Sequence, residues 1–204
     1  NDSVLVSSSR YGLNSSIGYS YNLFDFNNRD KLYGPQNKYK PDKVDQGLYL
    51  NSSLAYSFYE YGIGNSQSIL SFKLGPSLTY GDFEKDFLDF TSVSIMPELV
   101  IKNGESPFDY DDFNENQRIK VDIQQQLFGP LLMGLSTYYI IDSSNDNYGK
   151  FDDQIYYLGI SRRAYDLGLY YDENKESISL NFKIFNFGYS NFSKKFWLYF
   201  YKFN

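Results

Sequence analysis

Hydrophobic and polar residues alternate along most of this chain, in about ten segments of about ten residues each. Successive side chains of an extended strand point to opposite faces, so this pattern predicts strands with one apolar and one polar face. In segment 177–184 the polar residues Ser177, Ser179, Asn181 and Lys183 alternate with the apolar residues Ile178, Leu180, Phe182 and Ile184. The predicted strands cover residues 3–9, 12–23, 47–58, 67–79, 87–101, 117–127, 131–141, 154–162, 165–171 and 176–187.

The apolar faces of so many consecutive strands need something to cover them, and we expect lipid to do so. In a membrane barrel the apolar face is directed outward and the polar face lines a hydrated interior. Aromatic residues gather near the ends of the predicted strands, where the interfacial girdles of such a barrel lie. The sequence therefore predicts an all-β fold, an antiparallel transmembrane β-barrel with about ten strands in this chain.

The whole chain, residues 1–204, is predicted to be one segment of an outer-membrane β-barrel, the C-terminal part of a larger one. It begins at Asn1 without an initiator methionine, as expected for a mature or excised piece. Its tail, residues 193–204, is dense in aromatic residues and is predicted to form either one more strand or an interfacial anchor.

The connections between the predicted strands differ in length toward the C-terminus. Two are long, polar and acidic (102–116 and 142–153), whereas two others are short (128–130 and 162–164). Long external loops and short periplasmic turns are typical of outer-membrane barrels. Pro76 and Pro97 lie inside predicted strands, where a proline removes a ladder hydrogen bond, so we expect a bulge or a bend there.

Composition excludes several functional classes. The chain has 22 Tyr and 18 Phe, no Cys and no His, and a formal net charge of −6. Without Cys there is no disulfide and no thiolate metal site, and without His the commonest catalytic base and metal ligand is missing. The net negative charge argues against a nucleic-acid partner. We therefore expect no enzyme activity, no catalytic residues, no metal site and no cofactor.

Basic residues on the polar faces are the candidate binding residues. Lys73, Arg118 and Lys120 are predicted to point into the lumen, with Arg162 at a strand end. Their charge-assisted hydrogen bonds suit phosphate groups, so they are candidates to line a path for phosphorylated lipid headgroups. The alternative is local pairing with inward carboxylates, of which the candidates are Glu98, Asp122 and Asp166.

Several short stretches follow one another in a characteristic order: 74–78 (LGPSL), 87–93 (FLDFTSV), 102–108 (KNGESPF), 125–131 (QQLFGPL), 161–168 (SRRAYDLG) and 185–187 (FNF). In this order, about two thirds of the chain, from Gly75 onward, resembles the C-terminal barrel region of the LPS-assembly outer-membrane protein family (LptD), most closely its cyanobacterial branch. The better-known branch has adjacent cysteines where this chain has Arg162 and Arg163, so the covalent tether of that branch is impossible here.

The resemblance implies an outer-membrane protein of Gram-negative bacteria that transports lipopolysaccharide or a related lipid into the outer leaflet through a lateral seam. It implies periplasmic lipid-bridge proteins and the barrel-insertion machinery as partners. In that family the last strand pairs with the first. The seam strand would here be 176–187, with the polar-face residues Ser177, Ser179, Asn181 and Lys183.

Two other functions remain open from the sequence. A porin-like passive channel predicts ion conductance and a chain that closes by itself. A soluble carbohydrate-binding β-sandwich predicts that the apolar face with Ile178, Leu180 and Phe182 is buried in protein and that the chain needs no detergent.

Overall fold

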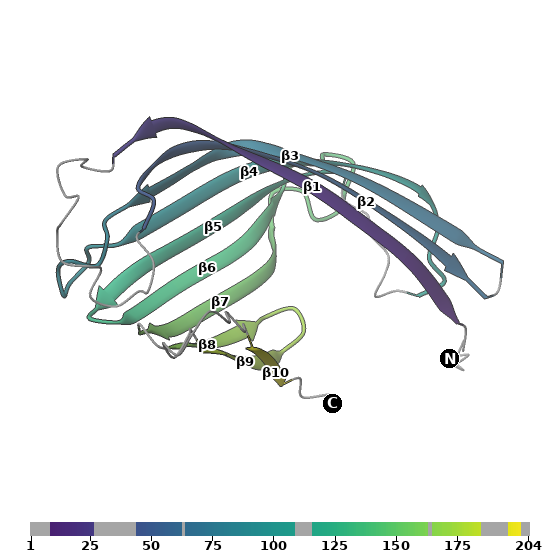
Figure 1. The fold of residues 1–204 in the computed structure, drawn as a ribbon. Helices are drawn as coiled ribbons and strands as arrows, with labels where there is room; N and C mark the ends of the chain where they lie inside the picture. The colour runs from purple at the N-terminus through teal and green to yellow at the C-terminus, as the bar shows by residue number, and fades with distance from the viewer. Residues whose placement is uncertain are drawn as a thin grey trace, which may run out of the picture.

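The computed structural model describes residues 9–26, 44–62, 64–108, 116–162 and 165–184, and the backbone of 196–200. Ten strands form one antiparallel sheet in which each strand pairs with its neighbours along the chain (Figure 1). They are β1 (Arg10–Asp25), β2 (Gly47–Tyr61), β3 (Ser66–Tyr80), β4 (Thr91–Gly104), β5 (Gln117–Phe128), β6 (Leu131–Ile140), β7 (Phe151–Ser161), β8 (Tyr165–Asp172), β9 (Ser177–Ile184) and β10 (Phe196–Phe200).

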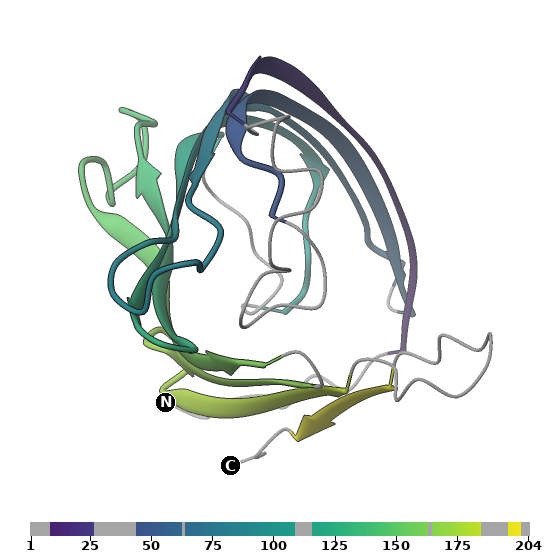
Figure 2. The ribbon, with the colours of Figure 1, turned by 60° about the vertical axis from the view of Figure 1, so that its left-hand side comes forward.

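The sheet is strongly curved, with β1 and β10 at its two edges (Figures 1 and 2). The predicted all-β, antiparallel architecture is confirmed. Among the described residues no ladder joins β1 to β10, so the sheet is an open arc and not a closed barrel. In the same residues no helix has the length and apolar character needed to cross a membrane.

The strand bounds follow the alternating pattern closely, with one clear error. Residues 87–90 were expected to begin a strand, but β4 begins only at Thr91. The rings of Phe83 and Phe90 are instead stacked with centroids 4.6 Å apart, and both are buried beside Leu132. Aromatic residues favour strands, but here they fill a small apolar core under the connection between β3 and β4. The predicted strand 3–9 lies outside the described residues except for Ser9, which is not in a strand.

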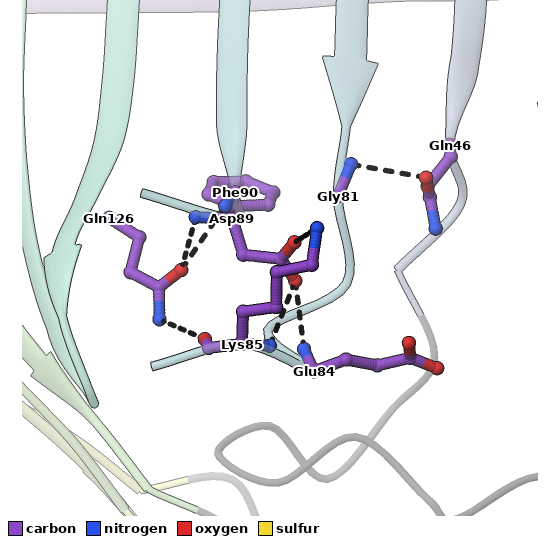
Figure 3. A network of polar contacts seen from close by, with 7 residues as sticks. All are labelled: Gln46, Gly81, Glu84, Lys85, Asp89, Phe90 and Gln126. Atoms are coloured by element: carbon purple, nitrogen blue, oxygen red, sulfur yellow. Dashed lines mark hydrogen bonds and ion pairs between the residues drawn. The ribbon is translucent and has the colours of Figure 1, made fainter. Parts of the chain in front are cut away.

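The side chain of Gln126 makes several of the hydrogen bonds that hold this connection against the sheet (Figure 3). Gln126, on β5, is 0% exposed. Its Oε1 accepts hydrogen bonds from the amides of Asp89 (2.9 Å) and Phe90 (3.2 Å), and its Nε2 donates to the carbonyls of Lys85 (3.2 Å) and Gly129 (2.8 Å). Every polar atom of the buried amide therefore has a hydrogen-bond partner. Through these bonds the side chain joins the β3–β4 connection to the β5–β6 turn.

The two faces of the sheet differ in an unusual way. Large apolar side chains on one face are exposed, among them Leu54 (43%) and Ile178 (60%). On the opposite, concave face, polar side chains are buried, including Gln67, Glu98, Arg118, Gln126 and Ser161. Side chains on the inside of a curved sheet crowd together, whereas those on the convex side spread apart. The molecule therefore has an apolar convex face and a polar concave face.

The two prolines interrupt the pairing of β3 and β4. Lys73 pairs with Glu98 and Ser77 with Ser94, but no pairs form between these two. The register is the same on both sides of the gap, so of the two expected outcomes, a bulge or a bend, the bulge is absent. The pairing is instead interrupted around the two residues that lack an N–H. At the centre of the gap, a Cβ on Gly75 would overlap the carbonyl oxygen of Ile95. A glycine thus allows the two backbones to approach closely.

Candidate functional site on the concave face

Three charged residues from three neighbouring strands form one cross-strand row on the concave face. The register places Lys73 of β3 opposite Glu98 of β4, and Glu98 opposite Arg118 of β5. Directly opposed residues of antiparallel strands have Cβ atoms about 5 Å apart, which is within reach of long charged side chains. The fold therefore brings together two of the predicted inward cations and a carboxylate that was predicted as their alternative partner.

Glu98 is the centre of this row and is only 3% exposed. Its Oε2 accepts a hydrogen bond from Arg118 Nε at 2.7 Å, and its Oε1 lies 3.4 Å from Lys73 Nζ. Ser71 Oγ donates a further hydrogen bond to Oε1. A buried carboxylate is stable only when it is paired and hydrogen-bonded, and these three donors meet that requirement.

Tyr138 of β6 closes the cluster on its other side. Its ring lies under the guanidinium of Arg118, with Cζ 3.7 Å from the ring centroid, which is a cation–π arrangement. Its hydroxyl is 3.4 Å from Lys73 Nζ. Arg118 is also attracted electrostatically by Asp153 of β7. Arg118 is thus held by several groups, whereas Lys73 contacts Glu98 and the Tyr138 hydroxyl only at the long distance of 3.4 Å.

Lys120 forms a separate ion pair on the same face. Its Nζ is 3.1 Å from Asp122 Oδ2, two residues further along β5, and both side chains are about one-third exposed (30% and 36%). Ser136 Oγ donates to Asp122 Oδ1 at 2.6 Å. The three predicted inward cations therefore all contact carboxylates, so the local pairing that the sequence left open occurs at Glu98 and at Asp122.

Arg162 is not part of this cluster. It follows β7 at the end of the sheet that carries the short β5–β6 turn, and its backbone amide donates to the carbonyl of Tyr165 at 2.8 Å. Arg118, in contrast, lies at the start of β5 and pairs with Ile140 at the opposite end of the sheet. The carboxylate nearest in sequence to Arg162, Asp166, accepts a hydrogen bond from Ser161 Oγ at 2.6 Å.

The predicted seam strand is an interior strand of the sheet. β9 carries all four predicted residues on one face, Ser177, Ser179, Asn181 and Lys183, and it pairs with β8 on one side and with β10 on the other. Segment 176–187 is therefore not the last strand, and of the two alternatives for the tail the further strand is the one observed. The aromatic tail supplies a further strand, and β10 is the edge.

Sequence reasoning missed Ser71 and Tyr138 as members of the cluster. Ser71 has the same parity as Lys73 on β3, which is a usable signal, because alternate residues share a face. No such signal pointed to Tyr138. Its neighbour Tyr139 is also a tyrosine, and only the register between β5 and β6 determines which of the two rings lies on the concave face. In the described ranges no three His, Cys, Asp or Glu residues are grouped so as to hold a metal ion.

Comparison with known proteins places the chain in a family and gives no functional precedent. No curated protein and no solved structure matches it. A family model described as "Protein of unknown function (DUF3769)" matches residues 1–188, which is nearly the whole chain. This curved, polar-inside sheet is therefore a member of the DUF3769 family.

Proposed function

We propose that this sheet is part of the wall of an outer-membrane β-barrel that transports lipopolysaccharide into the outer leaflet through a lateral seam. The convex face contacts hydrocarbon, and the concave face lines a hydrated interior along which the phosphorylated headgroup moves. Periplasmic lipid-bridge proteins deliver the lipid, and the barrel-insertion machinery places the protein in the membrane.

The reversed distribution of polar and apolar side chains is the observation that carries this proposal. Exposed apolar side chains continue from strand to strand across the convex face, as in the row Leu158, Leu169 and Leu180 of β7, β8 and β9. Soluble monomers rarely expose apolar patches of more than a few hundred Å², and larger ones mark membrane or protein contacts. The same row argues against the β-sandwich, which requires Ile178 and Leu180 to be buried in protein.

The height of the apolar face fits a membrane. On β2, five of the six convex positions from Leu48 to Phe58 are apolar. At about 3.3 Å per residue this stretch is about 33 Å long, and a tilt of about 40° reduces it to about 25 Å, which is the height of the apolar band of outer-membrane barrels. Exposed aromatic side chains lie near both ends of the strands, including Tyr80 and Tyr165 at one end and Phe58 and Tyr171 at the other.

Cysteine labelling tests the membrane orientation directly, because the chain has no cysteine of its own. Leu54→Cys and Leu158→Cys report on the convex face, and Ser53→Cys and Ser179→Cys report on the concave face. In outer-membrane vesicles containing the full chain, a water-soluble maleimide is expected to label the two serine positions and not the two leucine positions. All four should react after denaturation. Equal labelling of both faces before denaturation would overturn the proposal.

Photo-crosslinking tests the cargo. A photoreactive residue at position 120, which lies on the concave face, is expected to form an adduct that carries lipid A in cells. The same residue at Leu169 on the convex face is the comparison, because it samples all membrane lipids. If position 120 gives no lipid adduct while the purified protein conducts ions in a planar bilayer, a porin-like channel replaces lipid transport as the function.

A further inference from the structure

We propose that Lys73 and Tyr138 form the phosphate-binding site of the concave face, and that Arg118 serves to hold Glu98 and does not contact the ligand. This inference rests on the proposed function and names its ligand group, a phosphate monoester. Of the two cations that contact Glu98, Arg118 is committed to its partner, whereas Lys73 can exchange its partner.

Arg118 is committed because its loss would leave a buried charge. Its Nε is 2.7 Å from Glu98 Oε2, and the two side chains are only 10% and 2% exposed. Tyr138 covers its guanidinium face at 3.7 Å. Moving Arg118 toward a ligand would break a buried ion pair and a cation–π contact together, which is strongly unfavourable.

Lys73 can exchange its partner at low cost. Its side chain is 23% exposed, more than twice the fraction of Arg118, and its ammonium lies 3.4 Å from Glu98 Oε1, at the long limit of a hydrogen bond. When Lys73 turns away, Glu98 keeps the Ser71 hydroxyl and the Arg118 guanidinium as donors. The carboxylate is therefore not left unsatisfied, and the ammonium keeps its charge for an incoming anion.

Tyr138 supplies the second donor. Its hydroxyl is 3.4 Å from Lys73 Nζ, so an N–H and an O–H donor are near enough to bind two oxygens of one phosphate. Lys85, in the connection between β3 and β4, lies outside this arrangement: its side chain is 81% exposed, and its Nζ is 4.0 Å from Asp89 Oδ1. Lys85 therefore provides a matched control.

Binding of inorganic phosphate to the purified full chain in detergent, measured by isothermal titration, tests the site. Lys73→Gln is expected to lower the affinity by about tenfold or more, because a charge-assisted hydrogen bond contributes about 1.5–3 kcal/mol, or tenfold for each 1.4 kcal/mol. Tyr138→Phe is expected to lower it by about three- to tenfold through loss of one neutral hydrogen bond. Lys85→Gln should bind as the wild type does. Circular dichroism of each variant checks that the sheet is intact.

A second arm distinguishes free phosphate from a lipid headgroup. Vesicles of phosphatidylcholine with and without phosphatidic acid, a phosphate monoester lipid, are compared for lipid crosslinks to a photoreactive residue at position 77. Crosslinks that depend on phosphatidic acid and on Lys73 identify a headgroup site, whereas phosphate binding without them identifies a site for the free anion. Equal loss of phosphate binding in the Lys73 and Lys85 variants, or none in either, would overturn the site. The cysteine labelling pattern is independent of that result, so the membrane proposal is tested separately.

Discussion

Replacing Gln126 by methionine should loosen the connection between β3 and β4 without disturbing the strands. Methionine has nearly the volume of glutamine, so the change removes hydrogen bonds and leaves the packing largely intact. Two amides, of Asp89 and Phe90, and two carbonyls, of Lys85 and Gly129, lose their side-chain partner in a site where Gln126 is fully buried.

The magnitude follows from the number of bonds lost. Each hydrogen bond contributes about 0.5–1.5 kcal/mol net, and a buried group left without a partner loses more. Four bonds thus correspond to about 2–6 kcal/mol in the free energy of opening this connection. At about 1.4 kcal/mol per factor of ten, amide hydrogen exchange at Asp89 and Phe90 should become between about 30-fold and about 20,000-fold faster.

Hydrogen exchange with mass spectrometry on the full chain in detergent measures this effect. Gln124→Met is the matched control, since Gln124 lies two residues away on the same strand and is exposed. The control should leave exchange at Asp89 and Phe90 within about twofold of the wild type, which is about 0.4 kcal/mol. If Gln126→Met changes exchange no more than Gln124→Met does, the buried amide does not hold the connection and the reasoning is refuted.

Two further predictions concern the backbone and a titrating group. Gly75→Ala should destabilise the sheet by about 1–3 kcal/mol in urea unfolding, because the added Cβ would overlap the carbonyl oxygen of Ile95. If the urea midpoint of the variant equals that of the wild type, the two backbones do not approach closely. Hydrogen bonds from the Ser144 hydroxyl and from the amides of Asn116 and Ser144 hold the pKa of Asp142 below its ordinary value of 3.8. The stabilisation by Asp142 is therefore complete above pH 3.8 and is lost as the pH falls through the lowered pKa. The unfolding free energies of the wild type and of Asp142→Asn should differ above pH 3.8 and converge in stronger acid. Two curves that stay parallel over this pH range would refute the assignment.

The alternating pattern was sufficient for the strands and their faces. The two-residue period assigns each side chain to a face without knowledge of the neighbouring strands, because the direction of a side chain depends only on its own strand. It placed Lys73, Arg118 and Lys120 on the polar face, and the structure has all three there. It failed at residues 87–90, where aromatic residues suited to a strand instead pack into a local core.

The tail and the site show what lies beyond the pattern. Residues 196–200 are apolar at odd and even positions alike, so no period distinguished a strand from an interfacial anchor, and pairing with β9 decides for the strand. The prolines predicted a disturbance of the sheet, but a bulge and a gap in the ladder have the same sequence signal, and the partner strand decided between them.

The sequence by itself determined that this is a β protein with one apolar and one polar face, and that it contains no histidine and no cysteine. Only the tertiary structure decided that Glu98 lies between Lys73 and Arg118, that Tyr138 is the inward ring, and that Arg162 is at the other end of the sheet. The physical reason is register: these contacts join residues far apart along the chain, and a slip of one residue in the pairing would reverse every face.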